Sequence, residues 1–358
     1  MLRASTSIHG LNSAAMRFRA LSGAALLSVL FLSLFVLFPP SQVTRGQEPA
    51  AAQAEPIRVS VDRVNVGVIV TDTHGDFIEG LHREDFHILD DGVEQPVTDF
   101  ANISEPAQVL LLVEAGPAVY FLEASHVRAA HALLEGLSSG DRVAVVKYDA
   151  APQGVLDFTP DKQAAESALH NVRYYVGFGA LDLSRSLSTV LDWLDKVQGK
   201  KSIVLLSTGV DTSPPEIASA LMARVKTTDV RILALSLSGE LRQPAPDAKD
   251  SKSKKYKSHI PAEKSAIAAQ GFADADHLLS ALTQATGGRV FFPNTAKDFA
   301  GVYAQIAQLV RHEYSLAFAP PAHDGKLHTI DVRITPQADA PSTAYRIDHR
   351  SAYLAPKL

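Results

Sequence analysis

Three nearly continuous apolar runs, which alternate along the chain with helical patterns, constrain its fold most. They are QVLLLVE at 108–114, KSIVLLST at 201–208 and VRILALSL at 230–237. Strands of this composition are typical of a parallel sheet that is buried on both faces. Because they alternate with helices, they predict a doubly wound α/β domain.

The remaining elements of this domain follow from the same pattern. Helices are expected over 121–137, 161–173, 181–197, 214–227, 276–285 and 297–311, and further strands over 141–149, 154–158 and 289–292. The segment 239–273 interrupts this order, because it is poor in apolar residues and rich in Lys, Ser, Asp and Pro. We interpret it as a flexible surface insertion, with a basic docking site for an acidic surface as the alternative.

Short β patterns flank the α/β domain at both ends. Residues 57–104 alternate in the manner of strands and contain the turn DDG at 90–92, which predicts a small β module. The tail 313–358 carries EYSLAFAP, HTIDVRIT and AYRIDHR, strands that a parallel sheet does not need. We expect these strands to return to the β module and join the two ends of the chain, so that the domain proper covers 105–312.

The first 56 residues have the pattern of an export segment and a linker. Arg3, Arg17 and Arg19 precede an uncharged apolar run at 21–38, and Pro39 follows directly. Because the run is near the boundary between a signal-peptide core and a spanning helix, two alternatives stay open, cleavage with secretion and retention as a membrane anchor. Either alternative places the folded part outside the cytoplasm, in the periplasm or cell envelope or beyond it.

Composition excludes several classes of function. The formal net charge of −5 disfavours a nucleic-acid partner. The chain has no cysteine, so it has neither disulfides nor thiolate chemistry.

Several motifs resemble the von Willebrand factor A-related exported proteins of acidobacteria. The resemblance covers nearly all of the chain after the linker. It is carried by VIVTDTHGDFIEGLHREDFHILDDGVEQPVTDF at 68–100, LLLVEAGPAV at 110–119, VLLSTGVDTS at 204–213, EYSLAFAP at 313–320 and HRSAYLAP at 349–356. The resemblance implies an α/β fold with a doubly wound, Rossmann-like von Willebrand A sheet, an N-terminal β module and C-terminal closing strands.

The resemblance also implies a metal-ion-dependent adhesion site, but most of its ligands are missing. The family's Asp-x-Ser-x-Ser motif falls on Glu114, Gly116 and Ala118. Its middle Thr falls on Gly179, and its late Asp falls on Thr208. A hard cation such as Mg²⁺ needs near-octahedral oxygen ligands, so we predict a degenerate site that works without metal. Backbone amides at the start of the following helix are expected to satisfy Glu114.

Four other kinds of chemical site have candidate residues or motifs in this sequence. Asp182 and Asp211 lie close enough in sequence to rebuild a weak Mg²⁺ or Mn²⁺ site, so that alternative stays open. GFGALDL at 177–183 lacks the spacing of a nucleotide loop, and HREDFH at 82–87 is explained by a loop and strand without a metal. No G-x-S-x-G nucleophile motif occurs, so a hydrolase has no visible nucleophile.

These observations predict a non-enzymatic, exported, adhesion-like module that binds a protein partner in the envelope or the extracellular space. Its binding rim is expected at Glu114, Gly116, Ala118, Gly179, Asp182, Thr208 and Asp211. An atypical metal-assisted hydrolase and a structural envelope component are the alternatives. Fold alone favours none of them.

Overall fold

The computed structural model describes seven stretches of the chain, namely 63–103, 106–116, 123–173, 179–241, 262–295, 297–335 and 345–357. By contacts the chain divides into two units, Met1–Arg58 and Val59–Leu358, and all described residues belong to the second. The export segment and the linker therefore lie outside the described residues. Within the described stretches, no helix combines the length and the apolar character needed to cross a membrane.

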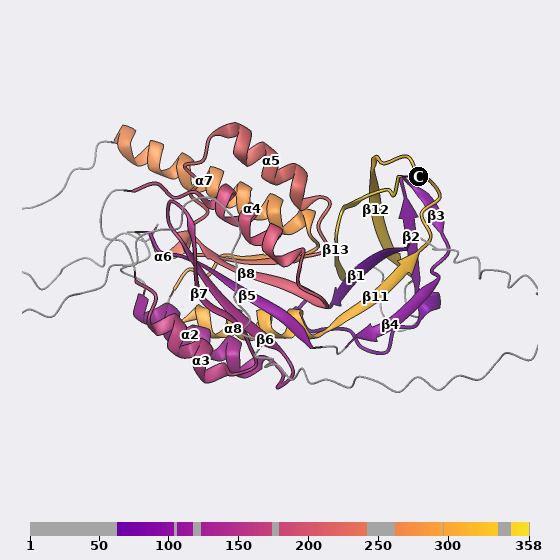
Figure 1. Ribbon diagram of the computed structural model, residues 1–358, viewed down its shortest axis with the longest axis horizontal. Coiled ribbons are helices and arrows are strands. Elements are labelled where there is room, and N and C mark those ends of the chain that lie inside the picture. Colours follow the sequence, from indigo (N-terminus) through magenta and orange to yellow (C-terminus); the bar gives the residue numbers. More distant parts are fainter. Residues whose placement is uncertain are drawn as a thin grey trace, which may run out of the picture. The chain divides into compact units, whose positions relative to one another are not determined.

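A six-stranded sheet forms the centre of the α/β part (Figure 1). Its strands are β5 (Ala107–Glu114), β6 (Arg142–Tyr148), β7 (Pro152–Thr159), β8 (Lys200–Ser207), β9 (Arg231–Ser236) and β10 (Val290–Phe291). Their spatial order is β10-β9-β8-β5-β6-β7, and every neighbouring pair is parallel except β6 and β7. This is the doubly wound order in which the winding reverses between the first and fourth strands. The predicted α/β fold class is confirmed.

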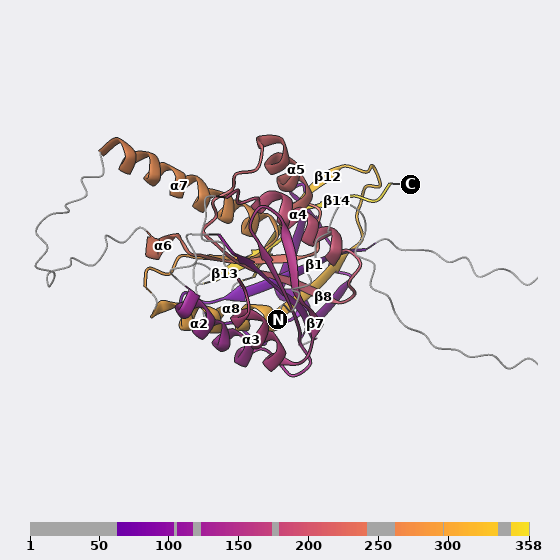
Figure 2. The same ribbon diagram turned by 60° about the vertical axis from the view of Figure 1, so that its left-hand side comes forward.

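Helices cover both faces of this sheet (Figures 1 and 2). Residues of α2 (Glu123–Gly136), α3 (Lys162–His170) and α8 (Asp298–Arg311) share one core cluster with the sheet. Residues of α4 (Leu183–Leu194), α5 (Pro215–Val225) and α7 (Ala262–Ala285) share the cluster on the opposite face. The short helix α6 (Ser238–Leu241) follows β9.

Local capping explains where several of these helices begin. Asp161 and Asp182 stand at the N-caps of α3 and α4, and each side chain accepts a hydrogen bond from a backbone amide of the first turn. Pro215 is the first residue of α5, where its missing amide hydrogen has no cost.

The predicted bounds of the insertion, 239 and 273, are both wrong. Residues 238–241 form α6, and α7 already begins at Ala262 rather than at residue 276. The average composition of residues 239–273 does not indicate the start of α7, because the alanine-rich stretch after 262 is averaged with the lysine- and serine-rich residues before it. Residues 242–261 lie outside the described residues.

The two ends of the described chain build a β-sandwich from two four-stranded sheets. One sheet has the order β13-β1-β11-β4, with β1 (Val64–Thr71), β4 (Asp99–Ile103), β11 (Glu313–Phe318) and β13 (Arg346–His349). Here β1 lies between two strands of the tail and is antiparallel to both. The prediction that the tail strands return to the front module is therefore confirmed.

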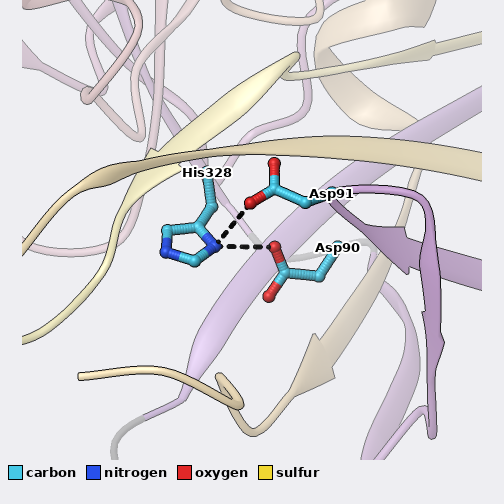
Figure 3. A group of neighbouring side chains, drawn as sticks. All are labelled: Asp90, Asp91 and His328. Carbon is cyan, nitrogen blue, oxygen red and sulfur yellow. Dashed lines mark hydrogen bonds and ion pairs between the residues drawn. The ribbon is translucent and has the colours of Figure 1, made fainter. Parts of the chain in front are cut away.

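The second sheet of the sandwich has the order β14-β12-β2-β3. Its strands are β2 (Phe86–Asp90), β3 (Val93–Gln95), β12 (Leu327–Ile334) and β14 (Ala352–Leu354), and the one-turn helix η1 (Arg83–Asp85) precedes β2. The register pairs Ile330 with Asp90, so the end of β2 and the start of β12 lie side by side (Figure 3). A single turn, in which Asp91 has φ +47° and Gly92 has φ +83°, connects β2 to β3.

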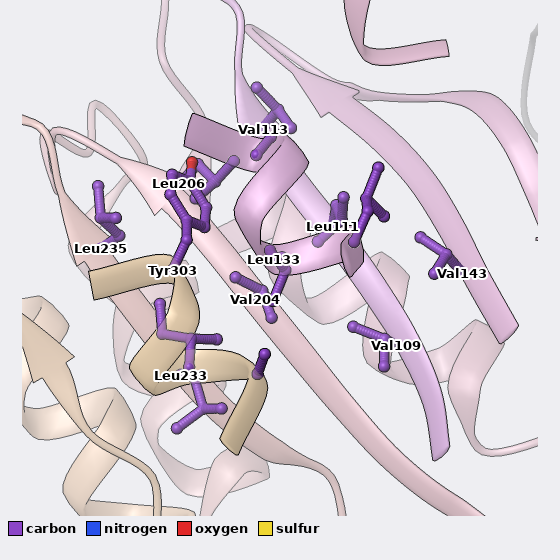
Figure 4. Packing of buried hydrophobic residues seen from close by; sticks show 14 of the residues in the cluster. Val109, Leu111, Val113, Leu133, Val143, Val204, Leu206, Leu233, Leu235 and Tyr303 are labelled. Carbon is purple, nitrogen blue, oxygen red and sulfur yellow. The ribbon is translucent and has the colours of Figure 1, made fainter. Parts of the chain in front are cut away.

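Alternation along β1 connects the sandwich to the α/β part. Val64, Val66, Val68 and Val70 face the core of the sandwich, whereas Ile69 belongs to the core beneath the central sheet. This central core consists of aliphatic side chains from four parallel strands packed against α2 and α8 (Figure 4). From α8, Tyr303 packs against it at 0% exposure. The β module is therefore not an independent domain, because its first strand contributes to both cores.

Candidate functional site

Three polar side chains stand at the point where the winding of the central sheet reverses. Glu114 ends β5, Tyr148 ends β6 and Ser207 ends β8. In open α/β sheets, ligands bind outside the carboxyl ends of the strands at this reversal. The register pairs Val113 with Leu206, so Glu114 lies opposite Ser207.

The carboxylate of Glu114 is enclosed by donors from the neighbouring strand. Its Oε2 accepts hydrogen bonds from the backbone amide of Thr208 at 2.7 Å, the hydroxyl of Thr208 at 2.8 Å and the hydroxyl of Ser207 at 3.0 Å. The hydroxyl of Tyr148 lies 3.3 Å from the same oxygen and 2.7 Å from the Ser207 hydroxyl. Glu114, Tyr148 and Ser207 are each 0% exposed, so a substrate does not reach this network from solvent.

The backbone amide that donates to Glu114 among the described residues is that of Thr208, in the loop after β8. The strand register places this first amide beyond β8 directly beside the end of β5. The amides that we expected, at the start of the helix after β5, lie outside the described residues.

Burial dominates the electrostatics of this network. It raises the pKa of Glu114, although the hydrogen bonds from Thr208, Ser207 and Tyr148 oppose that shift. Burial also raises the pKa of Tyr148, and the neighbouring charge of Glu114 adds to this effect. The phenol of Tyr148 is therefore a stable donor at neutral pH.

Above the network, two loops are tied together by polar contacts. The Ser213 hydroxyl donates to both Asp182 and Asp211, and the Ser184 hydroxyl donates to Asp211. Burial opposes the ionisation of Asp182, but hydrogen bonds from Ser213 and Arg185 bring its pKa below the usual value. We call residues 179–184 and 208–213 together the rim loops.

Backbone contacts fix the same two loops. The amide of Thr212 donates to the carbonyl of Leu181 at 2.7 Å, and the amide of Leu181 donates to the Thr212 hydroxyl at 2.9 Å. The amide of Asp182 donates to the carbonyl of Asp149, just beyond β6. The rim loops are thereby anchored to each other and to the sheet.

A leucine side chain lies directly over Gly116, just beyond the end of β5. A Cβ atom on Gly116 would lie 2.6 Å from Cδ2 of Leu181, and Leu181 is only 9% exposed. An apolar side chain therefore covers the end of β5 beside Glu114.

Among the residues that the structure describes, those at the reversal point do not fit a Mg²⁺ ion. Both oxygens of Glu114 already accept hydrogen bonds from Thr208. Gly116 has no side-chain oxygen, and Leu181 fills the adjacent space. A hard cation would need several oxygens in near-octahedral order at this point, and this set supplies one occupied carboxylate.

The structure separates the predicted rim residues into three groups. Glu114, Gly116 and Thr208 are buried, and Ala118 lies outside the described residues. Gly179 is exposed, and Asp182 and Asp211 are partly exposed. The sequence analysis gave no role to Tyr148, Ser207 or Ser184, of which only Tyr148 gave a signal, as a polar ring ending a buried strand.

The histidines of HREDFH do not form a common site. His82 stands at the N-cap of η1, where its backbone amide donates to Asp85 at 2.7 Å. His87 instead lies 2.7 Å from Glu94 on β3 and 2.7 Å from the Thr335 hydroxyl.

The pH dependence of stability should reveal the buried carboxylate. Because the pKa of Glu114 is raised in the fold, the folded chain retains a proton that the unfolded chain releases above about pH 4.5. The contribution of Glu114 to the free energy of unfolding is therefore largest at acidic pH. Between the pKa of Glu114 in the unfolded chain and its raised pKa in the fold, this contribution falls by up to about 1.4 kcal/mol per pH unit. In urea unfolding, the free-energy difference between wild type and Glu114→Gln should decrease with rising pH.

Glu84→Gln, at an exposed position, is the control for exchanging a glutamate for a glutamine and is measured at the same pH values. A difference for Glu114→Gln that grows with pH would contradict a raised pKa.

The leucine cover predicts a specific pair of substitutions. Gly116→Ser alone should lower the free energy of unfolding by about 1–3 kcal/mol, because its Cβ meets Leu181. With Leu181→Ala present, the same serine should cost less than half as much, as a double-mutant cycle in urea would measure.

Gly154→Ser is the matched control, because a Cβ at Gly154 meets nothing within 4 Å, and it should change stability by less than about 0.5 kcal/mol. Strict additivity of Gly116→Ser and Leu181→Ala would show that the two side chains do not compete for space.

Comparison with known proteins gives one partial family match and several similar solved structures. Residues 122–210 match the family described as von Willebrand factor type A domain. No curated protein matches the chain. Among solved structures, the chain is similar to the conserved hypothetical protein BatB from Bacteroides thetaiotaomicron, at 10% identity and TM-score 0.39, over 57% of this chain and 98% of that one.

Two further solved structures are similar. A von Willebrand factor type A protein from Catenulispora acidiphila gives 11% identity and TM-score 0.42, over 75% of this chain and 73% of that one. Proximal thread matrix protein 1 from the mussel byssus gives 12% identity and TM-score 0.39, over 58% of this chain and 49% of that one. The family match covers residues 122–210, from the start of α2 to the loop after β8, which is less than half of the chain.

Proposed function

We propose that this chain is a non-enzymatic protein-interaction module, held or released outside the cytoplasm, whose von Willebrand A-type domain binds a protein partner without a metal ion. The observation that carries the proposal is the closed network at the reversal point. There the carboxylate of Glu114 is used by donors of the chain itself, at the edge where such folds bind ligands.

Burial of this network favours binding over catalysis. Ser207 has a carboxylate and a phenol within hydrogen-bonding distance, but all three groups are 0% exposed. Catalysis by these groups would need a reacting atom within about 3 Å of the hydroxyl. The network therefore supports a structural role, in which it holds the ends of β5, β6 and β8 together.

The rim loops are the surface that this edge presents. Gly179, Ala180 and Thr212 are exposed, while the contacts among Asp182, Asp211 and Ser213 hold the loops in place. Loops that are ordered before binding lose less conformational entropy in a complex. A protein partner of matching shape is the ligand that such a preformed rim favours.

The extracytoplasmic location is inferred from the sequence. The basic residues before 21 and the apolar run at 21–38 favour export, with cleavage and anchoring as the two outcomes. A protein partner in the envelope or the extracellular space follows from that location.

Cross-linking on intact producing cells tests location and binding together. With a reagent that does not cross the cytoplasmic membrane, the wild-type chain should be linked to a reproducible protein partner. Ala180→Arg, which places a large charged side chain on an exposed position of the rim loops, should reduce that product at least about tenfold, since lost complementarity and a desolvated charge weaken binding.

Val93→Arg is the matched control, because Val93 is 63% exposed on β3 of the sandwich, and it should leave the product unchanged. Absence of any linked partner, or equal yield with Ala180→Arg, would refute the proposal. Ester or phosphoester hydrolysis that Ser207→Ala abolishes would support the hydrolase alternative instead.

A further inference from the structure

A second cluster of titratable side chains lies in the β-sandwich, at the turn between β2 and β3. Asp90 is the last residue of β2, Asp91 follows it in the turn, and His328 stands near the start of β12 (Figure 3). The strand register explains their meeting, because Asp90 pairs with Ile330, two residues beyond His328. No part of the proposed interaction surface includes these residues.

Three atoms of this cluster point at one another. Nδ1 of His328 lies 3.1 Å from Oδ1 of Asp90 and 2.9 Å from Oδ2 of Asp91. Ligand atoms of all three residues lie within 4.8 Å of one another. Figure 3 shows the two carboxylates converging on the same ring nitrogen.

The remaining polar atoms of the three residues have other partners. The Tyr353 hydroxyl donates to Oδ2 of Asp90 at 2.8 Å. The amide and hydroxyl of Thr329 donate to Oδ1 of Asp91 at 2.9 and 2.8 Å. Each carboxylate is thereby oriented from outside, so that its other oxygen faces the imidazole.

The contact made by Nε2, the second ring nitrogen of His328, indicates which nitrogen carries the proton. Nε2 lies 3.3 Å from Oδ1 of Asp324, so this carboxylate accepts a proton that Nε2 carries. Metal-binding histidines almost always make this outer contact to a carboxylate or carbonyl. With the proton on Nε2, the lone pair of Nδ1 faces two carboxylate oxygens, and a positive charge between these atoms, carried by a second proton or by a metal ion, removes their repulsion.

The charges agree with a metal ion at this place. Three carboxylates surround one imidazole, so the cluster stays negative even when His328 is protonated, and the Asp90 side chain is only 1% exposed. Two ligands about 2.1 Å from a tetrahedral ion lie about 3.4 Å apart, so the observed distances of 2.9 and 3.1 Å would widen by a few tenths of an ångström when the ion enters.

We propose that Asp90, Asp91 and His328 bind one divalent transition-metal ion, through Oδ1, Oδ2 and Nδ1, with water at the remaining positions. The imidazole favours Zn²⁺ and similar ions over Mg²⁺ or Ca²⁺, which prefer oxygen ligands alone. Asp91, whose side chain is 53% exposed, gives the ion a route from solvent. The ion would link β2 to β12 and, through Tyr353, to β14, so it would reinforce the joining of the two chain ends.

Calorimetric titration of the full chain with Zn²⁺, after removal of metal by a chelator, tests this site. One ion per chain should bind, and the melting temperature should rise, because a ligand of the folded state stabilises it. His328→Gln and Asp91→Asn should each weaken binding at least about tenfold. Asparagine also tolerates the positive φ of position 91, so this variant is expected to fold.

His87→Gln is the matched control, because His87 is another sandwich histidine, with one carboxylate, Glu94, at 2.7 Å, and it should bind Zn²⁺ as the wild type does. No saturable binding, or an equal loss with His87→Gln, would overturn the site. Mg²⁺ binding as tight as Zn²⁺ binding would overturn the assignment to a transition metal.

Discussion

The hydrogen bonds from Thr208 to the buried carboxylate of Glu114 are the interaction on which this edge of the molecule depends. They join the ends of β5 and β8 across the point where the winding of the sheet reverses. A carboxylate that is buried without partners would destabilise the fold by several kcal/mol, so the donors around it have to stay in place. The loop after β8 is thereby held close to the sheet, and Leu181 packs over Gly116. The edge at which such folds bind ligands is thereby closed in this chain, and the rim loops are the surface that it presents.

The β-sandwich constrains the chain in a different way, since its strands come from both ends of the described sequence. β1 is hydrogen-bonded to β11 and β13, and Ile69 on β1 also packs into the core of the central sheet. Buried charges reinforce the junction, because Glu313 at the start of β11 lies 3.1 Å from Lys200 on β8 and 3.4 Å from Arg231 on β9. Burial opposes the ionisation of Glu313, but these two cations bring its pKa below the usual value. Separation of the chain ends would therefore expose apolar surface and unpair charges together.

Much of this architecture could be predicted from the sequence because the signals are local. The apolar runs at 108–114, 201–208 and 230–237 predicted the parallel strands, and surplus strands in the tail predicted their return to the front module. The start of α7 at Ala262 was missed because composition averaged its alanines with the polar residues before it. The partner of Glu114 and the cluster around His328 depend on which strands pair and in which register. His328 is more than 230 residues from Asp90, and no local pattern encodes that meeting.

Mg²⁺ binding to the full His328→Gln chain tests the central claim most directly, because that variant removes the candidate cation site of the sandwich. The closed network predicts no heat of binding and an unchanged melting temperature at millimolar Mg²⁺, since an ion without a site on the folded state cannot stabilise it. Saturable Mg²⁺ binding that raises the melting temperature, and that Glu114→Gln abolishes, would contradict the account. It would mean that Glu114 exchanges its bonds to Thr208 for a cation.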